Sequence, residues 1–392
     1  MKKTLVALAA LASVTVFAQT SVVIDGFMDR GYLATNSTND TADSKLIASN
    51  SGTSTIGIKV REDMGAGLSM GLSINTDWAD IGGNTQTSAV ANAQTSGFAN
   101  SQSFIDITSA SMGTIRLGTP NNFTLTNSTA ISTPLFSTGV GSQYSSVYAH
   151  SGGLGTGTSG RGGTVDAAAT GSTGSNTTAR AIRISNTIQY SSPVFSGISV
   201  HLGLTQPNNN ISSTTTLGAG NTVGVNESAI RYTNGPVDAM YSTIKYTIGS
   251  NGVSQNVQVC ANGTCTQTVD TNTAQTSTQN LLGVAYTVMP GLVLNLGSGT
   301  YSSSNGTYQG NSRNYGGTYT MGMIDFMLLT SATNDTTTAN IDKKMTGYGV
   351  NYNLSKTARA YVRADNLNYY SNGAAASGSA IKRTAFGISK SF

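Results

Sequence analysis

The sequence predicts an all-β fold: a transmembrane antiparallel β-barrel of about 16 strands with an inward-folded third loop. Most of the chain consists of short stretches in which apolar and polar residues alternate, separated by turns rich in Gly, Ser, Thr and Asn. Charged residues make up only 10% of the chain, yet its mean hydropathy of −0.10 is close to zero rather than strongly apolar. A soluble globular protein carries about 25% charged residues. A barrel that turns apolar residues toward lipid and polar residues toward a wet lumen accounts for both values.

The last strand gives the most direct indication of a barrel. Residues 384–392 alternate, so that Phe386, Ile388 and Phe392 share one face. An outer-membrane barrel needs such a strand to close, and the terminal aromatic residue then lies at the membrane interface. The alternative class is a low-complexity or fimbrial-type extracellular β-protein, which has a similar polar composition.

The first 18 residues have the organisation of a secretory signal peptide. Two lysines precede an apolar run from Leu5 to Val16, and cleavage is predicted after Ala18. Residues 19–392 would then form the barrel as a single domain. The apolar run is too short for a transmembrane helix, and no later run reaches the roughly 18 apolar residues that such a helix needs. A membrane-spanning chain of this sequence must therefore cross as strands.

Alternation also assigns the two faces of each strand. Within residues 55–61, Ile56, Ile58 and Val60 share the face that would contact lipid, and the residues between them would face the lumen. The same assignment along the chain predicts a set of pore-lining side chains. They are Lys59, Arg61, Arg116, Arg183, Arg231, Lys245, Arg359, Arg363, Asp25, Asp29, Asp106, Asp365 and His201.

The longest stretch without strand-like alternation runs from about residue 119 to residue 181. A loop of this length in a compact fold is usually functional or disordered. We expect its first half, residues 119–150, to fold into the barrel and narrow the pore; the alternative is an outward, mobile loop. Residues 151–178 are so rich in Gly, Ser and Thr that they are expected to be flexible.

The only two cysteines, Cys260 and Cys265, flank an Asn-Gly pair at residues 262–263. Asn-Gly is a strong signal for a two-residue hairpin turn, so the cysteines would lie at cross-strand distance in an exported, oxidising context. We therefore predict a disulfide that pins an external loop. The only histidines, His150 and His201, are far apart in the sequence, so no four-ligand metal site is visible. No cofactor is predicted.

Six segments, in the same order along the chain, carry a family resemblance. They are residues 21–29, 62–68, 113–118, 183–197, 353–357 and 387–392. Together they resemble the 16-stranded trimeric general-diffusion porins of Gram-negative outer membranes, in the form typical of β-proteobacteria. The resemblance implies an outer-membrane location, a water-filled channel, a homotrimer and a third loop folded into the lumen. It also implies that the terminal Phe392 is read by the barrel-assembly machinery.

The predicted function is passive diffusion of small hydrophilic solutes and ions across an outer membrane. The basic lumen candidates outnumber the acidic ones, and residues 119–150 contain no Asp or Glu, so we expect a weak anion preference. The alternatives are a channel that prefers neutral solutes, a surface adhesion or structural barrel, and a barrel enzyme centred on His201. His201 lies in no recognisable catalytic motif, so we predict that the protein is not an enzyme.

The expected partners are two further copies of the chain, outer-membrane lipid, the barrel-assembly machinery and small hydrophilic solutes. Without the two lysines of the leader, 21 − 2 = 19 basic residues face 17 acidic ones. So small an excess of positive charge does not indicate binding to nucleic acid.

Overall fold

A computed structural model describes residues 20–37, 40–48, 50–77, 98–99, 101–132, 138–142, 186–205, 223–248, 255–261, 264–270, 275–304, 309–336, 341–371 and 374–392. Most of these residues lie in β-strands. Within these ranges no helix is both long enough and apolar enough to span a membrane.

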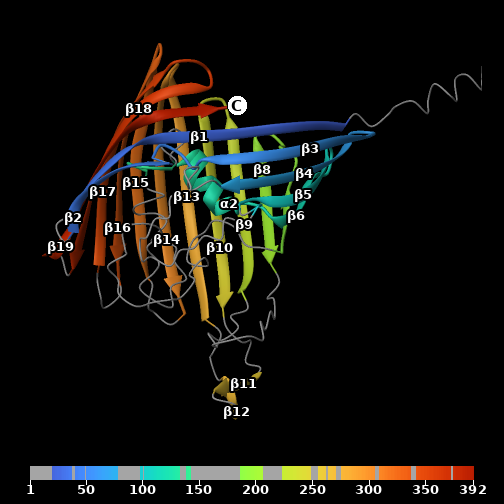
Figure 1. Cartoon of the computed structure of the whole chain (residues 1–392). Helices are drawn as coiled ribbons and strands as arrows, with labels where there is room; N and C mark the ends of the chain where they lie inside the picture. The colour runs from blue at the N-terminus through green and yellow to red at the C-terminus, as the bar shows by residue number, and fades with distance from the viewer. Residues whose placement is uncertain are drawn as a thin grey trace, which may run out of the picture.

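Seventeen strands form one antiparallel sheet that closes on itself (Figure 1). They are β1 (Thr20–Ser37), β2 (Asp40–Ala48), β3 (Thr55–Gly65), β4 (Leu68–Asp77), β5 (Ser103–Ser109), β6 (Gly113–Thr119), β7 (Thr187–Ser191), β8 (Ile198–Thr205), β9 (Val223–Asn234), β10 (Val237–Ile248), β13 (Gln275–Met289), β14 (Leu292–Ser303), β15 (Gln309–Met321), β16 (Ile324–Asp335), β17 (Ile341–Asn353), β18 (Ala358–Ser371) and β19 (Ala374–Ser391). β2 and β3 pair one after the other with the same edge of β1, so the 17 strands fill 16 positions around the barrel. The predicted barrel of about 16 strands is confirmed.

The barrel closes where the first strand meets the last. β1 pairs with β19 from Phe27 opposite Ser391 to Ser37 opposite Ile381. Beyond that ladder, the backbone of Phe392 exchanges two hydrogen bonds with that of Gly26, each 3.1 Å long. A Cβ atom on Gly26 would overlap the Phe392 ring, so the glycine leaves room for the terminal ring against β1.

The two faces of β8 differ in the way that alternation predicts. In β8, Val200 and Leu202 are exposed on the outer wall, whereas Ser199 and Thr205 are buried on the inner side. An apolar face exposed on an isolated chain is suited to contact with lipid. The large exposed apolar side chains of the other strands continue this outer surface around the barrel.

Tight turns join consecutive strands at one end of the barrel. β9 ends at Asn234 and β10 begins at Val237, and β13 and β14 are separated by Pro290 and Gly291. Gly291 has a φ of +86°, and a Cβ atom there would lie 2.5 Å from the carbonyl oxygen of Thr320. Glycine is therefore required at this turn by both its backbone angle and the close approach of β15.

The third external connection, between β6 and β7, folds into the barrel. It begins with α2 (Phe123–Thr126) and the π-helical turn η1 (Asn127–Ile131), which lie inside the ring of strands (Figure 1). Phe123 and Ile131 pack against Ala229 of β9 and Met240 of β10. The predicted inward-folded third loop is confirmed. Residues 133–137 and 143–150 of the predicted inward half, and all of residues 151–178, lie outside the described residues.

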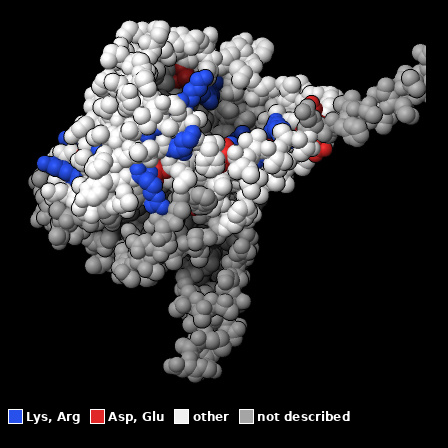
Figure 2. Space-filling view, turned by 45° about the horizontal axis from the view of Figure 1, so that its top comes forward, with Lys and Arg blue, Asp and Glu red and all other residues white. Residues whose placement is uncertain are grey.

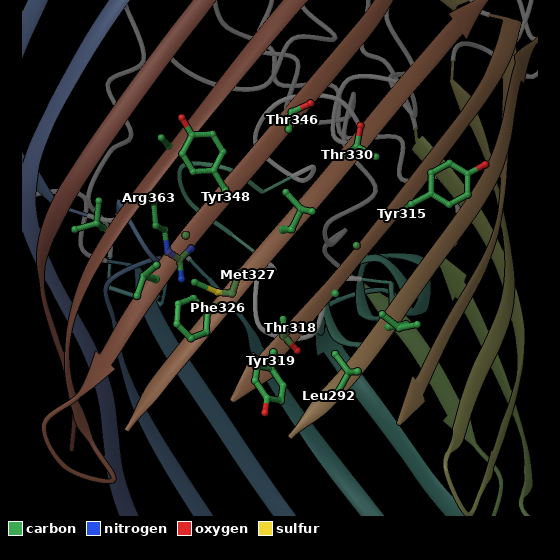
Figure 3. Close-up of a pocket in the computed structure, with 18 residues that line it drawn as sticks. Leu292, Tyr315, Thr318, Tyr319, Phe326, Met327, Thr330, Thr346, Tyr348 and Arg363 are labelled. Atoms are coloured by element: carbon green, nitrogen blue, oxygen red, sulfur yellow. The ribbon is translucent and has the colours of Figure 1, made fainter. Parts of the chain in front are cut away.

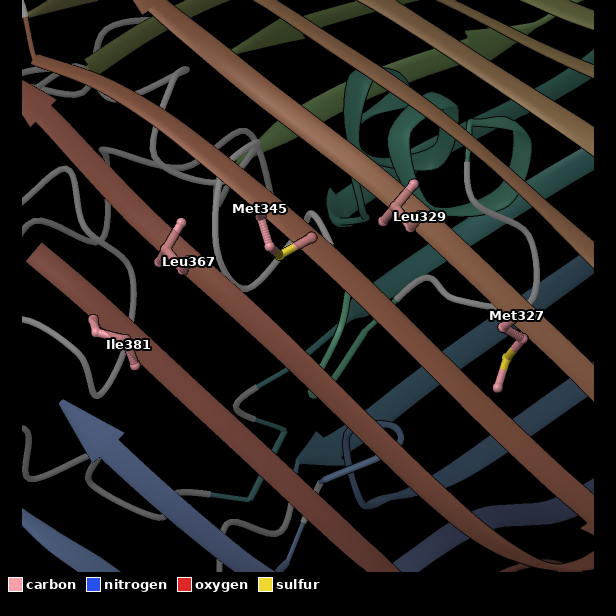
Figure 4. Packing of buried hydrophobic residues seen from close by; sticks show 5 residues of the cluster. All are labelled: Met327, Leu329, Met345, Leu367 and Ile381. Atoms are coloured by element: carbon pink, nitrogen blue, oxygen red, sulfur yellow. The ribbon is translucent and has the colours of Figure 1, made fainter. Parts of the chain in front are cut away.

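One sector of the inner wall is apolar. Five buried side chains on β16–β19 form a cluster that faces inward (Figure 4). They are Met327, Leu329, Met345, Leu367 and Ile381. The inner face of the barrel is therefore not uniformly polar, because it is apolar at this cluster on β16–β19.

A second, two-stranded sheet lies outside the barrel. It consists of β11 (Gln255–Ala261) and β12 (Thr264–Asp270), in the connection between β10 and β13 (Figure 1). Cys260 lies directly opposite Cys265 in this hairpin. Directly opposed residues of an antiparallel pair have Cα atoms about 4.5–5.5 Å apart, which is within the range that a disulfide spans. The disulfide itself remains a prediction.

Candidate functional site

The inward loop crosses the lumen and is attached to the inner wall at several points. The first attachment is at Glu227, a buried residue of β9. Its Oε1 atom accepts a hydrogen bond from the backbone N of Thr124 at 2.6 Å and another from Thr124 Oγ1 at 2.9 Å. Asn122 caps the same short helix by accepting a hydrogen bond from Leu125 N at 2.8 Å. The start of the loop is therefore held by a carboxylate of the wall.

Asn127 makes the second attachment. Its Nδ2 atom lies 2.9 Å from the carbonyl oxygen of Met240, 3.0 Å from that of Leu281 and 3.1 Å from Ser242 Oγ. A Cβ atom on Gly283 would overlap Asn127 Oδ1. The missing side chain at Gly283 therefore makes room for the asparagine against β10 and β13.

Two asparagines of the wall hold the next turn of the loop. Asn295 of β14 donates a hydrogen bond to the carbonyl oxygen of Ile131 at 3.0 Å. Asn314 of β15 donates one to the carbonyl oxygen of Ser132 at 3.1 Å. Because the last carbonyl groups of a helix lack partners within the helix, these two side chains supply the hydrogen-bond donors at the end of η1.

The far side of the lumen holds residues 138–142. The backbone N of Gly141 donates to Asp365 Oδ2 at 2.7 Å, and Arg363 Nη1 donates to the carbonyl oxygen of Thr138 at 2.9 Å. Arg383 of β19 forms a salt bridge with Asp365. A Cβ atom on Gly347 would overlap the Gly141 carbonyl oxygen. The loop thus spans the barrel from β9 and β10 to β17 and β18.

Three ion pairs line the inner wall away from these attachments. They are Lys59–Asp25, Arg61–Asp106 with N and O atoms 2.8 Å apart, and Arg231–Asp238 with N and O atoms 2.6 Å apart. In each pair the basic side chain is the more exposed partner, at 51%, 46% and 35% against 40%, 13% and 27% for its carboxylate. The basic side chains are therefore more accessible to solvent than their carboxylate partners.

A barrel whose lumen is crossed by an attached inward loop is the architecture of a channel with a constriction. The sequence model described as Gram-negative porin matches residues 4–373 of this chain. The chain belongs to the Gram-negative porin family. Together with the barrel, this membership establishes an outer-membrane diffusion channel and confirms the predicted outer-membrane location.

Solved structures share the fold of this porin. An anion-selective porin from Comamonas acidovorans is 19% identical, with a TM-score of 0.68 over 95% of this chain and 100% of the other. The trimer form of OmpT, an outer membrane protein of Vibrio cholerae, is 13% identical, with a TM-score of 0.61 over 95% and 99%. Salmonella typhi OmpF, in a complex with daunomycin, is 13% identical, with a TM-score of 0.60 over 95% and 97%. No curated protein sequence matches the chain.

The other predicted basic residues of the pore lie in different settings. Arg116 of β6 faces inward, with its guanidinium 5.3 Å from the centre of the Phe104 ring. Arg359 of β18 shares the inner face of that strand with Tyr361 and is half-buried. Arg183 lies outside the described residues.

Strand register places Lys245 on the outer wall of the porin, which corrects the prediction that it lines the pore. Lys245 is exposed and lies opposite Asn226 and Thr278, whereas the neighbouring Ile244 is fully buried on the inner side, opposite Glu227. The sequence of β10 has apolar residues on both faces, because part of its inner face packs under the inward loop. The alternation of residues in β10 therefore does not distinguish its lumen-facing side from its lipid-facing side.

Asp29 and Arg363 face inward, but they are buried attachments rather than free pore charges. Asp29 accepts hydrogen bonds from the backbone N atoms of Ser51 and Gly52 and from the Tyr361 hydroxyl, and so holds the break between β2 and β3. Arg363 is buried against the Thr138 carbonyl.

His201 is also enclosed. It lies on the inner face of β8 with each ring nitrogen 3.0 Å from a hydroxyl oxygen, that of Ser191 or that of Ser199. Its ring centre is 4.8 Å from that of Phe123 in the inward loop. These contacts make His201 a support for the start of the loop.

Sequence reasoning missed the wall residues that hold the loop. Glu227 is one of only two glutamates in the chain, which was a usable signal, but its strand lacks clear alternation. The polar residues Asn127, Asn295 and Asn314 are indistinguishable by composition from the many other asparagines. Only the pairing of distant strands brings them to the loop.

Proposed function

We propose that this porin is a passive channel for small hydrophilic solutes and ions, with a weak preference for anions. The observation that supports the preference is the exposure of the three lumen pairs, in which the basic side chain is always more exposed than its carboxylate partner. Wall charges in a narrow aqueous pore act on ions at short range. Because each exposed cation retains a nearby carboxylate, the preference would be weak.

Two further arginines add to this preference. Among the residues that the structure describes, no carboxylate forms a salt bridge with Arg116 or with Arg359. On the face shown in Figure 2, basic side chains also cover visibly more surface than acidic ones. The Comamonas acidovorans porin of similar fold is itself described as anion-selective, which agrees with the proposal.

The test is the reversal potential of single channels in a planar bilayer under a salt gradient. We expect large ohmic conductance steps and a reversal potential whose sign shows that anions are more permeant than cations. Replacing Arg116 and Arg359 with Gln should lower the anion-to-cation permeability ratio by about fivefold per charge, since a unit charge some 8 Å away in water shifts the energies of an anion and a cation by roughly 0.5 kcal/mol in opposite directions.

Lys245→Gln is the matched control, because it removes an equally basic residue from the outer wall. It should leave the reversal potential unchanged. A cation-selective wild-type channel would overturn the anion preference and keep the channel. An absence of conductance from correctly folded protein would overturn passive diffusion.

We further propose that three copies assemble into a trimer. The structure of Vibrio cholerae OmpT in its trimer form has a similar fold and supports this assembly. Conductance that appears in groups of three equal steps, together with a trimer mass in mild detergent, is the expected result. A monomer mass with single steps would contradict it.

A further inference from the structure

The outer wall over β15–β19 is arranged in layers that strand register brings into line. The uppermost layer is a row across these strands that starts with Arg313, Ala332 and Lys344 and continues through Asn368 to Ala380. We call the first three residues the cation row. Arg313 and Lys344 are exposed on the outer wall, since their strand neighbours Asn314 and Met345 are buried on the inner side.

The cation row has the geometry of a small anion site. Arg313 and Lys344 lie in register on either side of β16, so with strands about 4.8 Å apart their Cα atoms are roughly 10 Å apart. The only side chain between them is the methyl group of Ala332. Both long side chains can therefore converge on one anionic group once the Lys344 side chain turns from Tyr370 of β18 toward β16. No salt bridge joins either residue to any part of the chain that the structure describes.

Two neighbours complete the surroundings of the cation row. The Lys344 ammonium lies 5.0 Å from the centre of the Tyr370 ring. Asp342 shares the outer face of β17, and its Oδ1 atom accepts a hydrogen bond from the backbone N of Asp335 at 2.9 Å. The two cations thus keep a local excess of positive charge.

A row of polar side chains lies one step closer to the tight turns. Tyr315, Thr330, Thr346 and Asn366 are in register, and Lys382 ends the row on β19. Figure 3 shows Tyr315, Thr330 and Thr346 along the upper side of a hollow in the wall. The Tyr315 and Thr346 hydroxyls can donate to ester or sugar oxygens, whereas Thr330 Oγ1 already donates to the carbonyl oxygen of Met345 at 3.3 Å.

The hollow below this row is apolar. Its volume is about 890 Å³, and Leu294, Phe326, Leu328, Tyr348 and Val350 are among the residues that line it (Figure 3). Gly317 also lines it, and the absence of a side chain at this outward position deepens the groove. The hollow has the volume and the apolar lining to hold hydrocarbon.

The distance of the cation row from the tight-turn end of the barrel places this row near the edge of the membrane. Arg313 precedes the end of β15 at Met321 by 321 − 313 = 8 residues. At about 3.4 Å per residue and a tilt of about 40°, it stands roughly 20 Å from the tight-turn end. The apolar band of an outer-membrane barrel is about 25 Å tall. The cation row therefore lies near the headgroup level of the leaflet on the loop side, and the groove lies within the hydrocarbon.

We propose that this face of the wall binds a phosphate-bearing membrane lipid. The phosphate lies between Arg313 and Lys344, the oxygens that link headgroup and chains lie along the Tyr315 and Thr346 hydroxyls, and one acyl chain fills the groove. The order of charge, hydroxyl and apolar layers along the wall is the order of these parts in the lipid. The proposal rests on the membrane-spanning barrel and is independent of the ion preference of the pore.

The test is native mass spectrometry of the folded protein in detergent, titrated with phosphatidylglycerol or with diacylglycerol of the same chains. We expect retained phosphatidylglycerol and at least tenfold weaker retention of diacylglycerol. The double variant Arg313→Gln, Lys344→Gln should weaken phosphatidylglycerol retention roughly thirtyfold, because each of the two basic residues near a membrane surface contributes about 1 kcal/mol toward an anionic lipid. Inorganic phosphate at the same concentration should not compete, since it lacks the chain.

Two control variants make the result specific. Lys245→Gln removes an exposed outer-wall cation without this groove below it and should leave lipid retention unchanged. The exchange Arg313→Lys, Lys344→Arg keeps both charges and should bind the lipid as wild type does. Unchanged single-channel conductance shows that each variant is folded.

Three results would overturn the proposal. The first is equal retention of phosphatidylglycerol and diacylglycerol by the wild-type protein. The second is that Lys245→Gln weakens phosphatidylglycerol retention as much as the double variant does. The third is a wild-type oligomer that carries no lipid and that the double variant separates into monomers. The last result would assign the face to a second copy of the chain.

Discussion

Glu227 accepts two hydrogen bonds from Thr124, one from the backbone N at 2.6 Å and one from the side-chain hydroxyl at 2.9 Å. The two residues are more than a hundred positions apart in the chain, and their contact joins the inner wall to the loop that narrows the pore. Both are buried. The loop is therefore held at this point by two hydrogen bonds to one buried side chain of the wall.

We predict that Glu227→Ala loosens the constriction. Loss of the Glu227 side chain leaves the Thr124 amide and hydroxyl unpaired, which should weaken loop attachment by about 2 kcal/mol. Single-channel records should show larger and noisier open conductance. Glu62→Ala removes the only other glutamate, an exposed residue of β3, and should leave the records unchanged. Quiet, wild-type conductance in Glu227→Ala would show that the remaining attachments are sufficient.

A second prediction concerns Gly283 and Asn127. Gly283→Ala should destabilise the porin by about 1–3 kcal/mol, because the added methyl group overlaps Asn127 Oδ1. In an Asn127→Ala background the same change should cost less, since Asn127 Oδ1 is gone and only Ser132 Oγ, 2.6 Å from the added Cβ, still overlaps it. Urea unfolding of the four proteins in a double-mutant cycle measures this coupling. Additive effects would mean that the loop is not packed against β13 at this point.

The cysteine pair gives a third prediction. Because Cys260 lies opposite Cys265, the exported protein should contain no reactive thiol until a reductant is added, and two thereafter. The hairpin is separate from the barrel sheet, so reduction should leave the barrel's unfolding midpoint unchanged. Thiol titration and heat denaturation with and without reductant check both parts. Two reactive thiols in oxidised, exported protein would contradict the disulfide.

The end of the chain gives a fourth prediction. Phe392→Ala removes the ring that lies against Gly26 at the closing seam and should reduce the yield of folded barrel several-fold. Phe386→Ala is the matched control, because it removes an outward, similarly exposed aromatic residue from the interior of the same strand. The fraction that migrates as folded barrel without heating measures the yield. Equal yields from the two variants would deny the terminal position a special role.

Local pattern predicted the strands and most of their faces. The alternation of residues 198–205 and the final aromatic strand reflect the two solvents on either side of a barrel wall, so a single sequence shows them. The same reasoning failed at Lys245, because part of the inner face of β10 packs against apolar residues of the loop instead of water. It also took Asp29 for a free charge, because a buried carboxylate and a pore-lining one have the same sequence signature.

Period-two alternation, low charge and a terminal aromatic residue were sufficient to identify a membrane-spanning barrel, because each is a short-range response to lipid outside and water inside. The attachment of Thr124 to Glu227, the asparagine contacts of η1 and the alignment of Arg313 with Lys344 were decided only by the tertiary structure. These contacts depend on the register between strands that are distant in the chain. A shift of one residue would turn every such side chain to the other face, and no local pattern encodes that register.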